Sequence, residues 1–281
     1  MGDRLPDFLC VGGEKCATTW LHDVLRRHPG VYLPTIKETR YFESEYERSH
    51  EWYAGFFKGA RSTQVIGEVC PQYLHCEEAA RRIARDLPGA KIVVSLRDPV
   101  DRAYSQYWMD VRGYWARGEA PPPFEELATR GSDYLRKGLY ARQIQPYVAS
   151  FGKERVFILF SERLRTTPLA EVNRLLRWLG VSEVTDPGWL GAEKNQARRY
   201  VAPRLFGATR GLVSGLKRSP AARLVWWAKR VGIRDVVINA FERPARYPEM
   251  DAATRERLRQ YFVEPNEDLR HLLEIERLPW Q

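Results

Sequence analysis

The strongest constraint on the fold is an alternation of short apolar runs with longer helix-like stretches through the first 180 residues. Apolar runs that predict strands lie at 8–13, 64–69, 91–97 and 155–160. Stretches that predict helices lie at 18–28, 77–87, 99–115, 139–151 and 168–179. Strands that alternate with helices are typical of a parallel sheet, and runs without polar alternation fit strands buried on both sides. The sequence therefore predicts an α/β fold whose parallel sheet carries helices on both faces.

The rest of the chain has a different pattern. After about residue 185 we find no convincing strand, and the apolar spacing predicts helices at 203–213, 219–230, 251–263 and 265–276. No sharp change in composition marks a second domain. We therefore interpret residues 1–281 as one domain, with an α/β core over 1–180 and a mostly helical part over 185–281.

Three features bear on the cell compartment. No run of 18 apolar residues occurs, so no transmembrane helix is predicted. The N-terminal segment MGDRLPDFLCVGG lacks the pattern of a signal peptide. The four cysteines are too few for a disulfide framework and lack the paired spacing of zinc ligands: Cys10, Cys16, Cys70 and Cys76. We expect reduced thiols and a cytoplasmic protein.

Positive charge is concentrated in one segment. The chain carries a net charge of +9, and the stretch from Pro203 to Arg243 holds nine Lys/Arg against Asp235 and Glu242, a local excess of seven. Within it, residues 219–241 contain the pair Trp226-Trp227 among several cations. Three interpretations stay open: a packed helix with a solvated basic face, a surface for anionic membrane or a lipid-like acceptor, and a groove for a polyanionic glycan.

The turn between the first predicted strand and the first predicted helix reads GGEKCATT over residues 12–19. Glycines allow a tight turn, and amide groups at the start of a helix attract anions. Lys15 adds a positive charge, and the hydroxyls of Thr18 and Thr19 add donors to phosphate oxygens. The pattern is P-loop-like without being a Walker A motif, in which the lysine directly precedes Ser or Thr. A structural turn with an incidental lysine is the alternative.

A second candidate anion site follows the third predicted strand, where residues 97–105 read RDPVDRAYS. Pro99 suits the first turn of a helix and Asp98 can cap it. Arg97 then lies at the carboxyl end of a strand, where open α/β sheets bind ligands. Together with Ser105, this segment and the loop at 12–19 could hold two separate phosphates of one nucleotide.

These two motifs resemble those of sulfotransferases that use 3′-phosphoadenosine-5′-phosphosulfate (PAPS). That family has a Lys followed by a Thr pair, here Lys15 with Thr18 and Thr19, and an Arg with a Ser eight positions later, here Arg97 and Ser105. Weaker similarities indicate the branch of heparan sulfate and bacterial small-molecule sulfotransferases. They are Lys37-Glu38 with Tyr41-Phe42, Gly67-Glu68 with Pro71 and Tyr73, Gly138 with Tyr140, and the late loop RPARYPEM at 243–250.

Two positions depart from the family pattern. Position 17 is Ala where the family usually has Gly, so the loop must accommodate a Cβ atom there. The late loop has Arg243-Pro244-Ala245 where a Lys-Gly pair is common, which changes the backbone contacts expected of it.

The resemblance implies a P-loop-like fold and PAPS as cofactor, with 3′-phosphoadenosine-5′-phosphate (PAP) as product and no metal. The residues that it implies for cofactor binding are Gly13, Lys15, Cys16, Ala17, Thr18, Thr19, Trp20, Arg97, Ser105, Arg243, Arg246 and Tyr247. Those that it implies on the acceptor side are Lys37, Phe42 and Tyr140.

The expected reaction is in-line sulfuryl transfer, which needs positioning and charge stabilisation more than covalent chemistry. Lys15 would stabilise the departing oxygen. Glu38 is the expected general base, with Glu68 and His75 as alternatives, because the attacking group must lose a proton.

The resemblance implies an acceptor hydroxyl, or less readily an amine, on a sugar, lipid or secondary metabolite. Nucleic acid is not an expected partner, and a homodimer is among the expected assemblies. A P-loop kinase or other NTPase, and a non-catalytic basic module for membrane or nucleic acid, are the alternatives.

Overall fold

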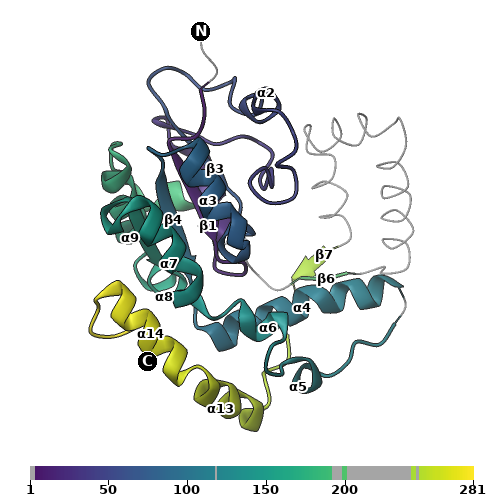
Figure 1. Ribbon diagram of the computed structural model, residues 1–281. Coiled ribbons are helices and arrows are strands. Elements are labelled where there is room, and N and C mark those ends of the chain that lie inside the picture. Colours follow the sequence, from purple (N-terminus) through teal and green to yellow (C-terminus); the bar gives the residue numbers. More distant parts are fainter. Residues whose placement is uncertain (1–3, 118, 192–197, 201–241, 245–246) are drawn as a thin grey trace.

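A five-stranded parallel sheet forms the centre of the computed structural model, which describes residues 4–117, 119–191, 198–200, 242–244 and 247–281 (Figure 1). The strand order is β2-β3-β1-β4-β5. The strands are β1 (Phe8–Gly12), β2 (Val31–Tyr32), β3 (Val65–Val69), β4 (Lys91–Leu96) and β5 (Val156–Phe160). Because all neighbouring strands run parallel, their carboxyl ends meet at one edge of the sheet.

Side chains alternate between two buried cores along each strand. In β1, Leu9 and Val11 face one core while Phe8 and Cys10 face the other. The first core packs against α3 (Glu77–Asp86), α7 (Tyr140–Phe151) and α14 (Val263–Leu273). The second packs against α1 (Thr18–Arg27) and α9 (Pro168–Leu179). Burial on both faces explains why the strand sequences are mostly apolar, and it confirms the predicted α/β class with helices on both faces.

Helix α4 (Pro99–Arg117) starts where the sequence predicts. Pro99 occupies its first position, where no intrahelical donor is needed. The carboxylate of Asp98 accepts a hydrogen bond from the backbone N–H of Val100 at 2.8 Å, as a helix cap does. A third apolar cluster joins α4 to the C-terminal helix α13 (Ala252–Tyr261). Figure 1 shows α13 and α14 lying along α4 and α7 at one end of the molecule.

The structure adds elements that the sequence patterns do not predict. Strand β2 has only two residues, too few for any periodicity to appear. The helices α2 (His50–Ala54), α5 (Phe124–Leu127), α6 (Asp133–Arg136) and α8 (Ser161–Thr166) are likewise short. Short 3₁₀ turns η1 (Tyr73–His75), η2 (Lys153–Arg155) and η3 (Pro187–Leu190) complete the connections.

The prediction that no strand follows residue 185 is wrong. Strands β6 (Arg198–Tyr200) and β7 (Glu242–Pro244) pair in antiparallel fashion. Their sequences, RRY and ERP, contain no apolar alternation, so only long-range pairing reveals them. The predicted helices at 203–213 and 219–230, and the basic segment 219–241, lie outside the described residues. In the described part of the chain, no helix is long and apolar enough to cross a bilayer.

Candidate active site

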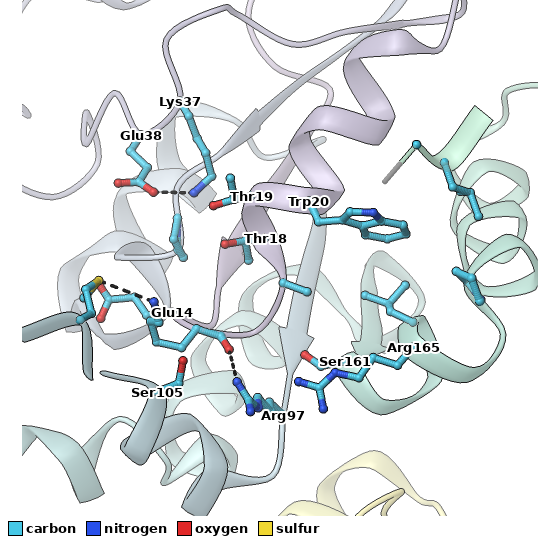
Figure 2. A pocket seen from close by; sticks show the side chains of 18 of the residues that line it. Glu14, Thr18, Thr19, Trp20, Lys37, Glu38, Arg97, Ser105, Ser161 and Arg165 are labelled. Atoms are coloured by element: carbon cyan, nitrogen blue, oxygen red, sulfur yellow. Dashed lines mark hydrogen bonds and ion pairs between the residues drawn. The ribbon is translucent and has the colours of Figure 1, made fainter. Parts of the chain in front are cut away.

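A cavity of about 810 Å³ opens at the carboxyl edge of the sheet, and we call it the central cavity. Residues from the turns after β1, β3, β4 and β5 line it, as do residues of α1 and α4. Its volume falls within the range of pockets that hold ligands of nucleotide size. Figure 2 shows the predicted phosphate-binding residues Thr18, Thr19, Arg97 and Ser105 around this one space.

The loop after β1 is held in place by hydrogen bonds to Ser95 of β4. The N–H of Gly13 donates to the carbonyl of Ser95 at 2.5 Å, and the Ser95 hydroxyl donates back to the carbonyl of Cys16 at 2.5 Å. A Cβ atom on Gly12 would meet Leu74 Cβ at 2.4 Å, so only glycine fits there. Ala17 has a left-handed backbone conformation, with φ 64°, directly before α1. This explains the family preference for glycine at that position, because a left-handed conformation is unstrained only without Cβ.

Lys15 lies near two other cations and two carboxylates. Its Nζ atom is 3.7 Å from Met109 Sδ on α4. The pKa of Lys15 is lowered to about 8, mainly by burial and in smaller part by the guanidinium groups of Arg112 and Arg97, against the opposing effect of nearby carboxylates. Cations held together at a partly buried position indicate a site that an anion would stabilise.

Arg97 retains hydrogen-bonding capacity that faces the cavity. Its Nη1 is 3.5 Å from the carbonyl of Lys15, and its Nη2 is 3.9 Å from the carboxylate of Asp101, which are both long contacts. Its buried Nε has no hydrogen-bond partner among the described residues. Ser105 lies two turns along α4 and lines the same cavity. Such an underused guanidinium fits a phosphate, which accepts in the fork geometry of Arg.

Glu38 lines the opposite end of the cavity from Trp20 (Figure 2). Its backbone is left-handed, with φ 65°, and its carboxylate accepts from Lys37 Nζ at 2.5 Å and from Gln72 Nε2 at 3.0 Å. Lys37 and Gln72 line the cavity as well. The structure therefore brings the predicted base and its predicted lysine together, next to the loop of Lys15.

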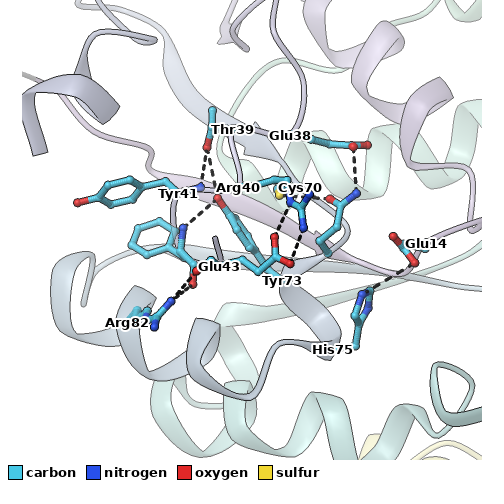
Figure 3. A network of polar contacts seen from close by, with 12 residues as sticks. Glu14, Glu38, Thr39, Arg40, Tyr41, Glu43, Cys70, Tyr73, His75 and Arg82 are labelled. Atoms are coloured by element: carbon cyan, nitrogen blue, oxygen red, sulfur yellow. Dashed lines mark hydrogen bonds and ion pairs between the residues drawn. The ribbon is translucent and has the colours of Figure 1, made fainter. Parts of the chain in front are cut away.

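Glu68 is buried behind the cavity and does not line it. Its carboxylate accepts from the backbone and hydroxyl of Thr39, and from the hydroxyls of Tyr53 and Tyr73. Burial raises the pKa of Glu68, and these hydrogen bonds partly oppose that rise. Figure 3 shows Thr39 and Tyr73 facing each other from two segments, with their hydroxyl oxygens 3.4 Å apart. Because both hydroxyls also donate to Glu68, this network ties the segment that carries Glu38 to β3.

His75 also lies outside the cavity lining, beside the phosphate loop. Its Nε2 is 3.9 Å from the carboxylate of Glu14, and Lys137 Nζ lies 2.6 Å from the same carboxylate. Burial and the nearby Lys137 lower the pKa of His75 to about 4, against the opposing effect of Glu14. The imidazole is therefore neutral at neutral pH. Its access to the cavity runs through Glu14, which does line it.

Four other predicted site residues are buried around the cavity without lining it: Gly13, Cys16, Phe42 and Tyr140. The hydroxyl of Tyr140 donates to the carbonyl of Arg97 at 2.8 Å and lies 3.9 Å from Cys16 Sγ, so it links the two phosphate motifs. Burial raises the pKa of the Cys16 thiol to about 11. Phe42 packs into a cluster of aromatic rings.

The residues predicted in the late loop are only partly described. Tyr247 stacks on Trp108 with ring centroids 4.7 Å apart, and its hydroxyl accepts from Arg112 Nη2 at 2.8 Å. This places Tyr247 against α4, on the helix that carries Ser105. The side chains of Arg243 and Arg246 lie outside the described residues.

The cavity also contains residues that the sequence patterns missed. Met109 lies one helical turn after Ser105, so helical spacing alone could have revealed it. Ser161 and Arg165 follow β5 directly, at the same edge as Arg97. The rule that ligands bind at the carboxyl ends of parallel strands could have identified both. Among the described ranges, no group of three or more His, Cys, Asp or Glu is placed to hold a metal ion.

Comparisons with known proteins identify the family to which the chain belongs. A family model described as a sulfotransferase domain matches residues 5–264. The chain is 32% identical over 205 residues to the bifunctional heparan sulfate N-deacetylase/N-sulfotransferase 4 of Mus musculus, covering 64% of this chain and 23% of that protein. It is 31% identical over 223 residues to the heparan sulfate glucosamine 3-O-sulfotransferase 6 of the same organism, covering 74% of this chain and 64% of that protein.

A solved structure extends the similarity to the whole fold. The sulfotransferase from Alicyclobacillus acidocaldarius superposes with a TM-score of 0.68 at 24% identity, covering 99% of each chain. The chain spans only about a quarter of the length of the bifunctional N-deacetylase/N-sulfotransferase 4.

Proposed function

This chain belongs to the sulfotransferase family, and from that premise we propose that it transfers a sulfuryl group from PAPS to an acceptor hydroxyl or, less readily, an amine. The observation that carries the proposal is the convergence of two anion-binding motifs on the central cavity. Lys15, Thr18 and Thr19 would bind the 5′-phosphosulfate. Arg97 and Ser105 would bind the 3′-phosphate that distinguishes PAPS from ATP.

The proposed reaction is an in-line displacement at sulfur. The acceptor oxygen forms a new bond to sulfur while the bond from sulfur to the bridging oxygen of the 5′-phosphate breaks, and PAP leaves. Lys15 stabilises the negative charge that develops on that bridging oxygen. The cations that already surround Lys15 increase the effect, because they are fixed before the reaction begins.

Glu38 is the proposed acceptor of the proton that the attacking hydroxyl loses. Its carboxylate reaches the cavity, and Lys37 and Gln72 hold it in place. Glu68 and His75 lack this access, so a supporting role suits them better: Glu68 anchors the Glu38 segment, and His75 supports Glu14. Trp20 lines the far end of the cavity and offers an aromatic surface for the adenine.

The acceptor class remains a proposal drawn from relatives. Their names describe both N- and O-sulfation of heparan sulfate glucosamine. We propose a hydroxyl on a sugar, lipid or secondary metabolite, and a screen of such acceptors with radiolabelled PAPS would identify it. A cytoplasmic location and a homodimer stay predictions from the sequence.

Thermal denaturation with added nucleotide tests the donor. A ligand that binds only the folded state raises its stability by an amount set by concentration and affinity. PAP should therefore raise the melting temperature strongly, while ATP with Mg²⁺ should raise it little. Stronger stabilisation by ATP with Mg²⁺ would contradict the proposal and favour a kinase or NTPase.

A further inference from the structure

The end of β5 contributes two side chains that the proposed mechanism has not used. In the parallel pairing of β4 with β5, Leu96 is aligned with Phe160. The next residues along, Arg97 and Ser161, therefore emerge side by side at the carboxyl edge of the sheet. Ser161 begins α8, and Arg165 lies one turn further along this helix. Both line the central cavity.

The Ser161 hydroxyl lacks a partner although it is buried. Ser161 is 2% exposed, and its Oγ has no hydrogen-bond partner among the described residues. A buried hydroxyl without a partner destabilises the protein, and most buried polar groups are paired. Because this hydroxyl lies at the wall of the cavity, a ligand oxygen could restore the missing bond.

Arg165 supplies a cation that no described acid neutralises. In the described part of the chain, its side chain makes no hydrogen bond or ion pair. Figure 2 shows its guanidinium directed toward Ser161 and Arg97. Glu162 follows Ser161 on the same helix, and its Oε1 accepts from the backbone N–H of Asp98 at 3.0 Å. Its Oε2 is buried and has no hydrogen-bond partner among the described residues, so this carboxylate does not pair with Arg165.

The charge of a 3′-phosphate exceeds what Arg97 alone can neutralise. Arg97 faces Asp101, whose carboxylate lies 3.9 Å from it, so part of its positive charge is offset. A 3′-phosphate carries nearly two negative charges at neutral pH. One partly neutralised guanidinium is a weak match for such a group, and a second, unpaired guanidinium at the same edge supplies the balance.

We propose that Arg165 and Ser161 complete the 3′-phosphate site with Arg97, and that Arg165 sets the preference for nucleotides that carry a 3′-phosphate. The inference rests on the proposed use of PAPS. It assigns a specificity role to the turn after β5, so three neighbouring strands, β1, β4 and β5, each contribute one turn to nucleotide binding.

Titration calorimetry with PAP and AMP tests the inference, because the two nucleotides differ only in the 3′-phosphate. In Arg165→Ala, PAP affinity should fall by about ten- to hundredfold, the range for a hydrogen bond between charged groups. AMP affinity should stay unchanged. Arg163→Ala is the matched control, since Arg163 lies on the same helix with its guanidinium over the Phe160 ring and does not line the central cavity.

Two results would overturn the inference while leaving the proposed function intact. One is an equal loss of PAP and AMP affinity in Arg165→Ala. The other is wild-type PAP affinity in that variant. If the wild-type protein instead binds PAP no better than AMP, the proposed function itself fails.

Ser161→Ala gives a second, independent readout. Removal of an unpaired buried hydroxyl should leave the nucleotide-free melting temperature unchanged or higher. PAP affinity should nevertheless fall by about threefold or more, with AMP affinity unaffected. A lower melting temperature with unchanged PAP affinity would mean that the hydroxyl serves the fold rather than the ligand.

Discussion

At the scale of single residues, the proposed chemistry depends on Lys15 and Glu38, which occupy different loops. Both have left-handed backbone conformations, with φ 66° and 65°. Residues other than glycine adopt this conformation only where surrounding contacts hold it. Ser95 holds the Lys15 loop, and Gln72 and the carbonyl of Val69 hold Glu38. The reactive groups are therefore positioned before a ligand arrives.

Glu38→Gln should reduce turnover by about a hundredfold or more, because the amide cannot accept the acceptor's proton. PAP affinity should remain intact. Steady-state kinetics with labelled PAPS and titration of PAP separate the two quantities. Glu43→Gln is a suitable control, since Glu43 lies on the same segment, pairs with Arg40 and does not line the cavity. An unaltered turnover in Glu38→Gln would remove Glu38 from the role of base.

The Lys15 amine should take up a proton when a nucleotide binds. The pKa of Lys15 in the folded protein, about 8, lies below its ordinary value of 10.5. Between pH 8 and pH 10.5 the unfolded chain therefore binds more protons than the folded protein. In this pH range the contribution of Lys15 to the free energy of unfolding rises with pH. A bound polyanion has the opposite effect and raises the pKa of Lys15 again. At about pH 8.5, PAP binding should therefore take up as much as about three quarters of a proton.

Calorimetry in two buffers of different ionisation enthalpy measures this uptake. Lys15→Met should abolish it while leaving some PAP affinity from Arg97 and Ser105. Buffer-independent binding heats in the wild-type protein would show that Lys15 does not change its protonation.

At the scale of elements, the loop after β1 contains a strained residue, Ala17, at its junction with α1. Ala17→Gly should raise the free energy of unfolding by about 0.5–1 kcal/mol, since glycine removes the steric cost of φ 64° but gains entropy in the unfolded chain. Urea denaturation measures the change. Ala84→Gly, inside the regular helix α3, should instead lower it by about 1 kcal/mol. Equal losses at both positions would mean that Ala17 is unstrained.

The elements themselves were largely predictable, because burial imposes a pattern on the sequence. Strand β4, predicted at 91–97, spans Lys91–Leu96, and α9, predicted at 168–179, spans Pro168–Leu179 and ends before Gly180 in a left-handed conformation. Short elements such as β2 and α8 carry too few residues for a period to show. Their positions depend on contacts that are distant in the sequence.

The residues that line the candidate site were predictable where a motif lies on one short segment. The loop around Lys15 and the Arg97–Ser105 motif are of this kind, and both meet at the cavity. The buried position of Glu68 could not be read from its neighbours, because its partners Tyr53 and Thr39 come from other segments. The same holds for the unpaired state of Ser161, which only the packed structure reveals.

At the scale of the whole molecule, α13 contacts the proposed nucleotide site through α4. Arg255 on α13 donates to the carboxylate of Asp101 at 2.9 Å, and the other oxygen of that carboxylate faces Arg97 at 3.9 Å. Asp101 is thus shared between a remote cation and a proposed ligand of the 3′-phosphate. We therefore expect the position of α13 to influence how freely Arg97 can bind an anion.

Arg255→Ala should weaken PAP binding by about two- to fivefold, the effect expected from an exposed ion pair. Without Arg255, Asp101 pairs with Arg97 alone and competes with the phosphate. Calorimetry provides the affinity, and Arg259→Ala, one turn along the same helix and exposed, is the control. Tighter PAP binding in Arg255→Ala would instead mean that Asp101 does not compete.

The buried carboxylate of Glu68 keeps the segment of the proposed base apart from the turns that would bind the donor. Its bonds to Thr39 fix the Glu38 segment to β3, whereas the proposed donor contacts follow β1, β4 and β5. A protein engineer could thus vary the surface of the Glu38 segment to retarget the enzyme, keep Thr39, Tyr53 and Tyr73 unchanged, and leave the donor machinery untouched. This separation depends on the side chain of Glu68, which does not line the central cavity.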